Sequence, residues 1–123
     1  MINKNILKSC HNEGFGEEEI YGAYKIFFGT MVSESRLKIL NLLRKGKKNV
    51  SEIMEELKMD QTAVSHDLAR LRKCGFVVVE NDGKFRDYKI NDETIAPLLD
   101  LIDKHMAENC IHILKAGGGK YGE

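Results

Sequence analysis

Residues 60–75, DQTAVSHDLARLRKCG, constrain the fold more than any other stretch, because they hold a helix start signal, a helical repeat and a helix stop signal. Asp60 is a favourable N-cap, since its carboxylate accepts hydrogen bonds from first-turn N–H groups that have no helical partner. Gly75 follows a basic turn and suits the position just beyond the end of a helix. The stretch is therefore predicted to form one helix.

The predicted helix has two different faces. Val64, Leu68 and Leu71 recur at i, i+4 and i+7, so they form the face that we expect to be buried. The opposite face carries short hydrogen-bonding or cationic side chains, the types that contact base edges and phosphate oxygens in a DNA major groove. Any amphipathic surface helix also has a polar face, so an ordinary solvated helix stays open. The polar face consists of Gln61, Thr62, Ser65, His66 and Arg70.

Three helices are predicted before this stretch, over residues 17–31, 34–44 and 51–57. The first has apolar residues at helical spacing and glutamates in its first turn, where the helix dipole favours them. Ser33 or Ser35 is expected to cap the second helix and Ser51 the third. The short connection between the third helix and residue 60 predicts a helix-turn-helix.

The hydrophobic period changes to that of strands after Gly75. Branched and aromatic residues stand on both sides of Asn81-Asp82-Gly83, which predicts a hairpin with strands over 76–80 and 84–90. Lys84 and Arg86 lie near its tip, where they could place cations on a phosphate backbone.

The two ends of the chain complete the predicted organisation. Residues 91–115 predict the longest helix, because apolar residues recur along one stripe: Ile95, Leu98, Ile102, Met106 and Ile113. Pro97 lies close enough to its first turn to be tolerated. Residues 1–16 are expected to form an arm, held loosely or docked on a partner, with one short helix at most. A domain over 17–115 and a flexible tail over 116–123 complete the expected division of the chain.

Composition excludes several classes of protein. A chain of 123 residues allows one domain with a modest core, and Lys+Arg and Asp+Glu are balanced at 19 each, which argues against a polybasic binder. Basic residues gather over 36–48 while both ends are acidic, although charge runs usually form solvated faces. Three cysteines give no disulfide framework, and no apolar run suits a signal peptide or membrane span. We therefore expect a cytoplasmic protein.

Residues 28–90 contain three motifs in addition to the order of elements. FGTMVSESRLKIL, at 28–40, is similar to the pattern F-x-A-L-[SA]-[DE]-x-[TS]-R-L-x-I-L; VSHDL, at 64–68, is similar to V-S-x-H-L; LRKCGFV, at 71–77, is similar to L-x-x-A-G-L-V. With the hairpin up to Tyr88, these residues resemble the ArsR/SmtB family of winged helix-turn-helix repressors. The resemblance implies a mainly α fold with a small β-hairpin, in the order α-α-α-α-β-β-α.

The resemblance also implies how such a chain binds DNA. The helix that starts at Gln61 would read the major groove, the hairpin would contact the backbone or minor groove as a wing, and the first and last helices would pair in a homodimer. The DNA would be a palindromic operator with half-sites about one helical turn apart. The DNA-binding residues are then expected to be Gln61, Thr62, Ser65, His66, Arg70, Lys84 and Arg86.

Members of the family lose DNA affinity when they bind a metal or react through thiols. A site in their last helix has the pattern Asp-x-His, then His-x-x-His or His-x-x-Glu; Asp92, His105 and Glu108 match three of its four positions, and Thr94 departs from the fourth. The resemblance thus implies a weakened site for zinc or another divalent transition metal. Asp92 and His105 would lie roughly 20 Å apart on one helix, so only an antiparallel partner helix could unite them. Alternatively, Asp92 caps or charges the helix start and the other two are solvated.

A second candidate sensor involves both chain ends. Cys10 and His11 with Cys110 and His112 could form a metal cluster or a redox-switch disulfide if the end segments pack together. Buried or idle cysteines are the alternative, and we interpret Cys74 as a packing residue.

The sequence therefore predicts a DNA-binding transcriptional regulator, a repressor that a metal or thiol-reactive effector releases from its operator. The alternatives are a winged-helix protein-interaction module and an effector-independent DNA-binding protein. An enzyme is not expected, since the chain has no phosphate loop or nucleophile elbow and too little mass for a deep pocket.

Overall fold

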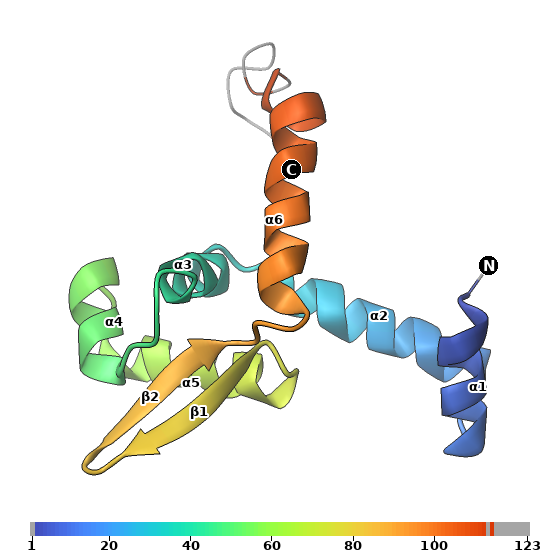
Figure 1. Ribbon diagram of the computed structural model, residues 1–123, viewed down its shortest axis with the longest axis horizontal. Helices are drawn as coiled ribbons and strands as arrows, with labels where there is room; N and C mark the ends of the chain where they lie inside the picture. The colour runs from blue at the N-terminus through green and yellow to red at the C-terminus, as the bar shows by residue number, and fades with distance from the viewer. Residues whose placement is uncertain (1, 113, 115–123) are drawn as a thin grey trace.

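The computed structural model describes residues 2–112 and 114. The fold is a body of helices with one β-hairpin, and two further helices project from this body (Figure 1). The elements are α1 (Lys4–Asn12), α2 (Glu17–Met31), α3 (Glu34–Leu43), α4 (Val50–Leu57), α5 (Gln61–Lys73), β1 (Val77–Asp82), β2 (Phe85–Ile90), α6 (Ile95–His105) and the π-helical turn η1 (Met106–Cys110). The prediction of a mainly α winged helix-turn-helix is confirmed, and α1 is the one short helix that the prediction for the N-terminal arm allowed. Over residues 2–112 and 114, every helix is too short or too polar to span a lipid bilayer.

The core lies where α3, α4, α5 and the hairpin meet. The predicted stripe of α5 is confirmed, because its three apolar residues are buried. Phe76 is fully buried and packs on Phe27 of α2, with ring centroids 5.0 Å apart. The largest fully buried apolar side chains are Ile39, Leu40, Leu43, Ile53, Val64, Leu68, Leu71, Phe76 and Val77.

The helix-turn-helix is formed by α4 and α5. The expectation that Ser51 caps α4 is wrong, because Asn49 is the N-cap: its side chain accepts from the Glu52 N–H, and the Glu52 carboxylate accepts from the Asn49 N–H, both at 2.9 Å. This reciprocal capping box satisfies two first-turn donors and outcompetes a single serine. Lys58, in the left-handed conformation with φ 57°, ends α4 and turns the chain toward Asp60.

The hairpin is attached to the body by backbone hydrogen bonds. β1 pairs antiparallel with β2 in the register Val77↔Ile90, around a two-residue turn in which Gly83 has φ 60°. Lys48 N donates to Tyr88 O at 3.0 Å and Tyr88 N donates to Lys48 O at 2.8 Å, so the loop before α4 pairs with β2. The wing therefore has a fixed position relative to the helix-turn-helix.

The last helix starts later than predicted and is not uniform. The Asn91 carboxamide oxygen accepts from the N–H groups of Glu93 and Thr94, which forms a turn that delays the helix to Ile95. Five residues of π-helix, Met106–Cys110, then interrupt it. The chain is helical again at residues 111, 112 and 114, as predicted. Residues 113 and 115 and the predicted tail over 116–123 lie outside the described residues.

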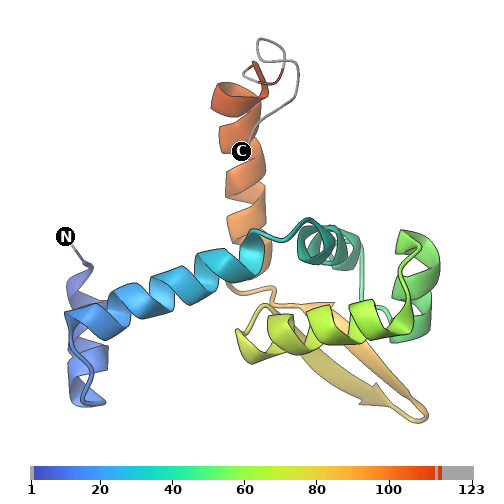
Figure 2. The ribbon, with the colours of Figure 1, turned by 180° about the vertical axis from the view of Figure 1, so that it is seen from behind.

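The two projecting helices are α2 and α6. They leave the body in different directions, and α1 crosses the far end of α2, as both views show (Figures 1 and 2). Arg44 at the end of α3 secures the base of α6 through Asp103 (2.8 Å) and Asp100 (2.5 Å). Hydrogen bonds to these carboxylates, that to Asp103 first, raise the pKa of Arg44 above its usual value.

Candidate nucleic-acid interface

The exposed face of α5 carries most of the predicted DNA-reading residues. Asp60 caps the helix through a hydrogen bond from the Ala63 N–H at 2.8 Å, as predicted. Because the buried stripe faces the core, the opposite side of the first two turns points to solvent. Four predicted residues are exposed there: Gln61, Thr62, Ser65 and His66.

A buried carboxylate fixes the orientation of α5. Asp67 is only 6% exposed; the Ser35 hydroxyl donates to its Oδ2 at 2.5 Å, and Arg36 Nη1 donates to its Oδ1 at 3.3 Å. Arg36 Nε also donates to the Thr30 carbonyl oxygen at 2.8 Å, so one guanidinium connects α5 to the end of α2. Sequence reasoning missed this network, although a charged residue beside the apolar stripe of a predicted helix was a usable signal.

Arg70 does not point freely to solvent as predicted. Its side chain is half-buried, and its Nε donates to the Thr30 hydroxyl at 3.1 Å. That hydroxyl donates to the Ile26 carbonyl oxygen at 2.8 Å and lies 3.3 Å from the Cys74 sulfur, so the thiol is left to donate to it. Arg70 and Cys74 therefore join the end of α5 to α2, and a DNA contact by Arg70 stays a prediction.

A hollow of about 590 Å³ separates α5 from β2. Arg70 lies at the boundary of the exposed face of α5, so the exposed cations of its last turn are Arg72 and Lys73. Neither residue was predicted from the sequence to bind DNA. Ser65, Ala69 and Arg72 recur at i, i+4 and i+7, which would have placed them on one face. The Arg86 guanidinium carbon lies 5.8 Å from the centroid of the Tyr88 ring. The hollow is lined by Val50, Ser65, Leu68, Ala69, Arg72, Lys73, Arg86 and Tyr88.

Charge pairing distinguishes the two basic regions of the chain. Most cations of residues 36–48 are engaged: Arg36 pairs with Asp67, Lys38 with Glu34, Arg44 with Asp100 and Asp103, Lys47 with Glu80, and Lys48 with Glu56. Of the wing cations, Lys89 pairs with Asp92 at 3.1 Å. In the described part of the chain, no carboxylate pairs with the other cations of α5 and the wing. These cations are Arg70, Arg72, Lys73, Lys84 and Arg86. The uncompensated positive charge therefore lies on α5 and the hairpin rather than on the basic run.

The residues predicted to bind metal are not brought together within one chain. Asp92 forms an ion pair with Lys89 at 3.1 Å, while His105 and Glu108 are exposed beyond the middle of the last helix. Asn109 Nδ2 donates to the His105 carbonyl oxygen at 3.1 Å. Over residues 2–112 and 114, no three His, Cys, Asp or Glu side chains gather as a metal site. A site with these donors would need a second chain.

The two halves of the predicted thiol sensor are also apart in one chain. Cys10 and His11 belong to α1, whereas Cys110 and His112 lie at the end of the projecting last helix, and α1 crosses the far end of α2 in both views (Figures 1 and 2). All three cysteines are free and half-buried.

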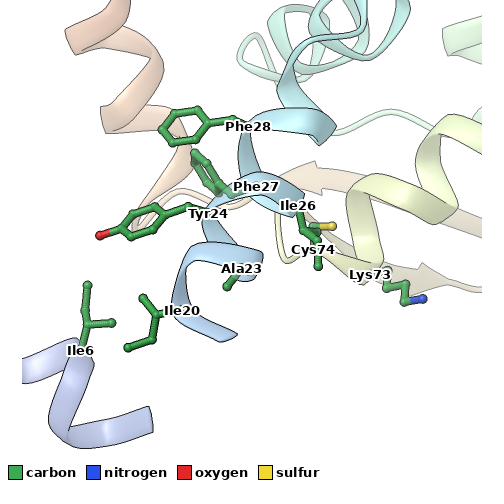
Figure 3. Close-up of a pocket in the computed structure, with 9 residues that line it drawn as sticks. All are labelled: Ile6, Ile20, Ala23, Tyr24, Ile26, Phe27, Phe28, Lys73 and Cys74. Carbon is green, nitrogen blue, oxygen red and sulfur yellow. The ribbon is translucent and has the colours of Figure 1, made fainter. Parts of the chain in front are cut away.

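A second surface is apolar and lies on α2. A groove of about 640 Å³ is bordered by Ile6 of α1, by aromatic and aliphatic side chains of α2, and by Lys73 and Cys74 at the end of α5 (Figure 3). Phe28, one of the lining residues, is 58% exposed, and Leu101 on α6 is 65% exposed. Contiguous exposed apolar surface of this kind marks interaction sites.

The chain is similar to known regulators over this region. The family model "Bacterial regulatory protein, arsR family" matches residues 33–79, from α3 to β1. The HTH-type transcriptional regulator NmtR of Mycobacterium tuberculosis is 41% identical over 70 residues, 57% of this chain and 58% of that protein. A protein of Streptomyces lividans named "Probable mercury resistance operon repressor" is 32% identical over 83 residues, 68% of this chain and 66% of that protein. The chain thus spans less than two thirds of these two relatives.

Other relatives match over most of their length. The "Uncharacterized HTH-type transcriptional regulator Rv0081" of M. tuberculosis is 30% identical over 108 residues, 82% of this chain and 95% of that protein. Its crystal structure superposes with a TM-score of 0.69, covering 72% of this chain and 90% of that chain. The solution structure of the homodimeric winged helix-turn-helix DNA-binding domain Mb0332 of Mycobacterium bovis has a TM-score of 0.72 at 26% identity, covering 78% and 89%.

Proposed function

The chain belongs to the arsR family of bacterial regulatory proteins, and from this membership we propose that it is a transcriptional regulator that binds duplex DNA through α5 and the hairpin. The observation that carries the proposal is the uncompensated positive charge on α5 and the wing, next to four exposed hydrogen-bonding side chains. Cations without internal partners attract phosphates, and short polar side chains read base edges. A protein-interaction module would not require unpaired cations next to exposed hydrogen-bonding side chains.

The proposed docking places the first two turns of α5 in the major groove. There Gln61, Thr62, Ser65 and His66 meet base edges, while Lys84 and Arg86 of the wing meet the backbone. The buried Asp67 network and the backbone pairing of Lys48 with Tyr88 hold the helix and wing in one arrangement. This fixed spacing supports the binding of a specific duplex geometry.

We expect Gln61→Ala and Arg86→Ala to have different effects. Gln61→Ala should change which sequence is preferred, with a loss of about 1–3 kcal/mol of discrimination at one base pair, because it removes a side chain able to pair with a base edge. Arg86→Ala should weaken all sequences alike and reduce the salt slope of log Kobs by about 1. Fluorescence anisotropy with duplexes selected by the native protein measures both. Lys38→Ala, outside the proposed interface, serves as the control, and no change in either test variant would contradict the assignment.

A homodimer is the proposed assembly. The exposed apolar side chains of α2 and α6 belong to the two helices that project from the body, so they can meet a second copy without moving the DNA-binding face (Figure 1). The Mb0332 domain, which the chain resembles in structure, is homodimeric. Two copies related by a twofold axis present two α5 helices, which would match a palindromic operator.

Regulation by an effector is the final part of the proposal. The Streptomyces relative is named a repressor of a mercury resistance operon, and by similarity we propose that this chain is a repressor released by a metal or a thiol-reactive compound. The described residues of one chain do not assemble three donors, so a metal would need Asp92 of one chain with His105 and Glu108 of the other. The sensor at the chain ends would need Cys10 to approach Cys110. Bound zinc would supply charge and cross-linking between the last helices.

Metal content tests this part directly. We expect the native protein to retain zinc after gel filtration and to lose DNA affinity with zinc bound, and we expect His105→Ala to lose both properties. His66→Ala, which removes a histidine from the DNA-facing helix, should retain zinc. If His105→Ala retains the same amount of zinc, this ligand set is ruled out. If an oxidant lowers DNA affinity, and Cys10→Ser or Cys110→Ser abolishes that loss, the thiol sensor is supported instead.

A further inference from the structure

We propose that the hollow between α5 and β2 seats a single phosphate of the DNA backbone, held from one side by Arg72 of the helix and from the other by Arg86 of the wing. The inference rests on the proposed function and adds a specific binding seat to it. It assigns a role to Arg72, which is not among the DNA-binding residues predicted from the sequence.

The lining of the hollow has the chemistry of an anion seat. Arg72 and Lys73 come from α5 and Arg86 from β2, and none of its lining residues is acidic. The Ser65 hydroxyl is a further donor at the same surface. Ala69 is the smallest side chain of the exposed face and leaves the space open. Two guanidinium groups on opposite walls can each form charge-assisted hydrogen bonds to phosphate oxygens.

The geometry of duplex DNA places a phosphodiester strand at this position. Adjacent major and minor grooves are separated by one backbone, so a helix in the major groove and a wing at the neighbouring minor groove must lie on either side of it. The hairpin lies beside α5 in both views (Figures 1 and 2). The backbone that separates the two grooves would therefore pass over the hollow between α5 and β2.

The cationic groups are available and partly positioned before DNA binds. Arg86 lies over the ring of Tyr88, which is 8% exposed and tied to Lys48 by two backbone hydrogen bonds. Neither Arg72 nor Arg86 has a carboxylate partner among the described residues, so DNA would not have to displace an internal acid. Positioned, unpaired donors lose less free energy to ordering when the ligand binds.

Single-phosphate neutralisation tests the seat. The native protein first selects a duplex from random-sequence DNA, and that duplex is then made with one methylphosphonate, which is uncharged, at each backbone position in turn. We expect one position per half-site to weaken native binding roughly 10-fold, the size of a lost charge-assisted hydrogen bond. Arg72→Gln and Arg86→Gln should each weaken binding to the unmodified duplex and lose sensitivity at that same position, while they keep it elsewhere.

The controls separate this seat from general electrostatics. Lys104→Gln removes the same charge from α6, which projects away from the hairpin (Figure 1), and should retain the native methylphosphonate profile. The inference is overturned if Arg72→Gln keeps the native sensitivity, or if the two arginine variants lose sensitivity at different positions. In either case DNA binding by the native protein leaves the proposed function intact, whereas a native protein that selects no duplex overturns both.

Discussion

Asp67→Ala is expected to lower the free energy of unfolding by about 3–5 kcal/mol, because it leaves the mostly buried Arg36 guanidinium without its carboxylate. Arg36 would keep its hydrogen bonds to the backbone carbonyls of Thr30 and Gly29, but its charge would be uncompensated. The Ser35 hydroxyl would lose its acceptor as well. The same change removes the hydrogen bonds that link α5 to Ser35 and Arg36 of α3, so DNA affinity should fall with stability although Asp67 faces away from the proposed interface.

Urea unfolding followed by circular dichroism measures the effect. Glu34→Ala is the matched control, since it also removes one partner of an ion pair, but the Glu34–Lys38 pair is exposed and should contribute about 0–1 kcal/mol. If Asp67→Ala costs no more than Glu34→Ala, the buried pair does not hold α5 in place. Replacement of the pair by apolar residues, Arg36→Met with Asp67→Leu, should recover much of the lost stability, because no buried charge then lacks a partner.

Phe28→Asp is expected to convert the dimer to monomers and to weaken operator binding by about 100-fold or more, equivalent to about 3 kcal/mol. Phe28 is already 58% exposed in a single chain, so the new carboxylate is solvated in the monomer and should change its stability little. In the dimer the carboxylate would be buried without a partner, which is strongly unfavourable. A monomer presents one α5 and can hold only one half-site.

Sedimentation equilibrium and anisotropy measure the two consequences separately. Ser51→Asp places the same additional charge on the exposed surface of α4, at the opposite end of the body from α1 (Figure 1), and should leave the dimer intact. A Phe28→Asp protein that stays dimeric would show that the exposed face of α2 is not the interface between copies. A monomer with native DNA affinity would show that dimerisation is not needed for binding.

The sequence allowed the positions of the main elements to be predicted, because local signals determine them. Asp60 and Gly75 act within one turn of α5, and the change from helical to alternating periodicity after Gly75 depends only on neighbouring residues. The caps were less certain where two candidates competed. Asn49 capped α4 instead of Ser51, since only Asn49 has a glutamate at the position that completes the capping box.

Partners distant in sequence account for what could not be predicted. Basic residues gather over residues 36–48 in the sequence, but acidic residues of α4, α5, β1 and α6 neutralise most of these cations in the folded chain. Arg70 was assigned to the open face of α5, whereas Thr30 of α2 holds its guanidinium at the boundary. Arg72 then becomes the exposed arginine of the last turn. No local pattern encodes these pairings.

The sensor prediction depends on two chains, because the described residues of one chain do not bring the proposed donors together. Asp92 precedes the start of α6, whereas His105 is its last residue. The helix that carries Cys10, α1, crosses the far end of α2 (Figure 1). The family motif specifies residue types and spacing along the chain, but the distance between donors depends on how two chains pair. Metal content of the dimer and its His105→Ala variant therefore tests a property that sequence spacing alone does not determine.

Selection from random-sequence duplex DNA tests the central proposal most directly. Because two α5 helices are expected to bind two major grooves, the native protein should enrich a twofold-symmetric sequence with half-sites about one helical turn apart. Binding of that duplex should weaken steeply as salt is raised, since phosphate contacts by Arg72, Lys84 and Arg86 release counterions. Enrichment of no sequence, together with no salt-dependent binding to any duplex, would contradict the proposal that α5 and the hairpin form a DNA-binding surface.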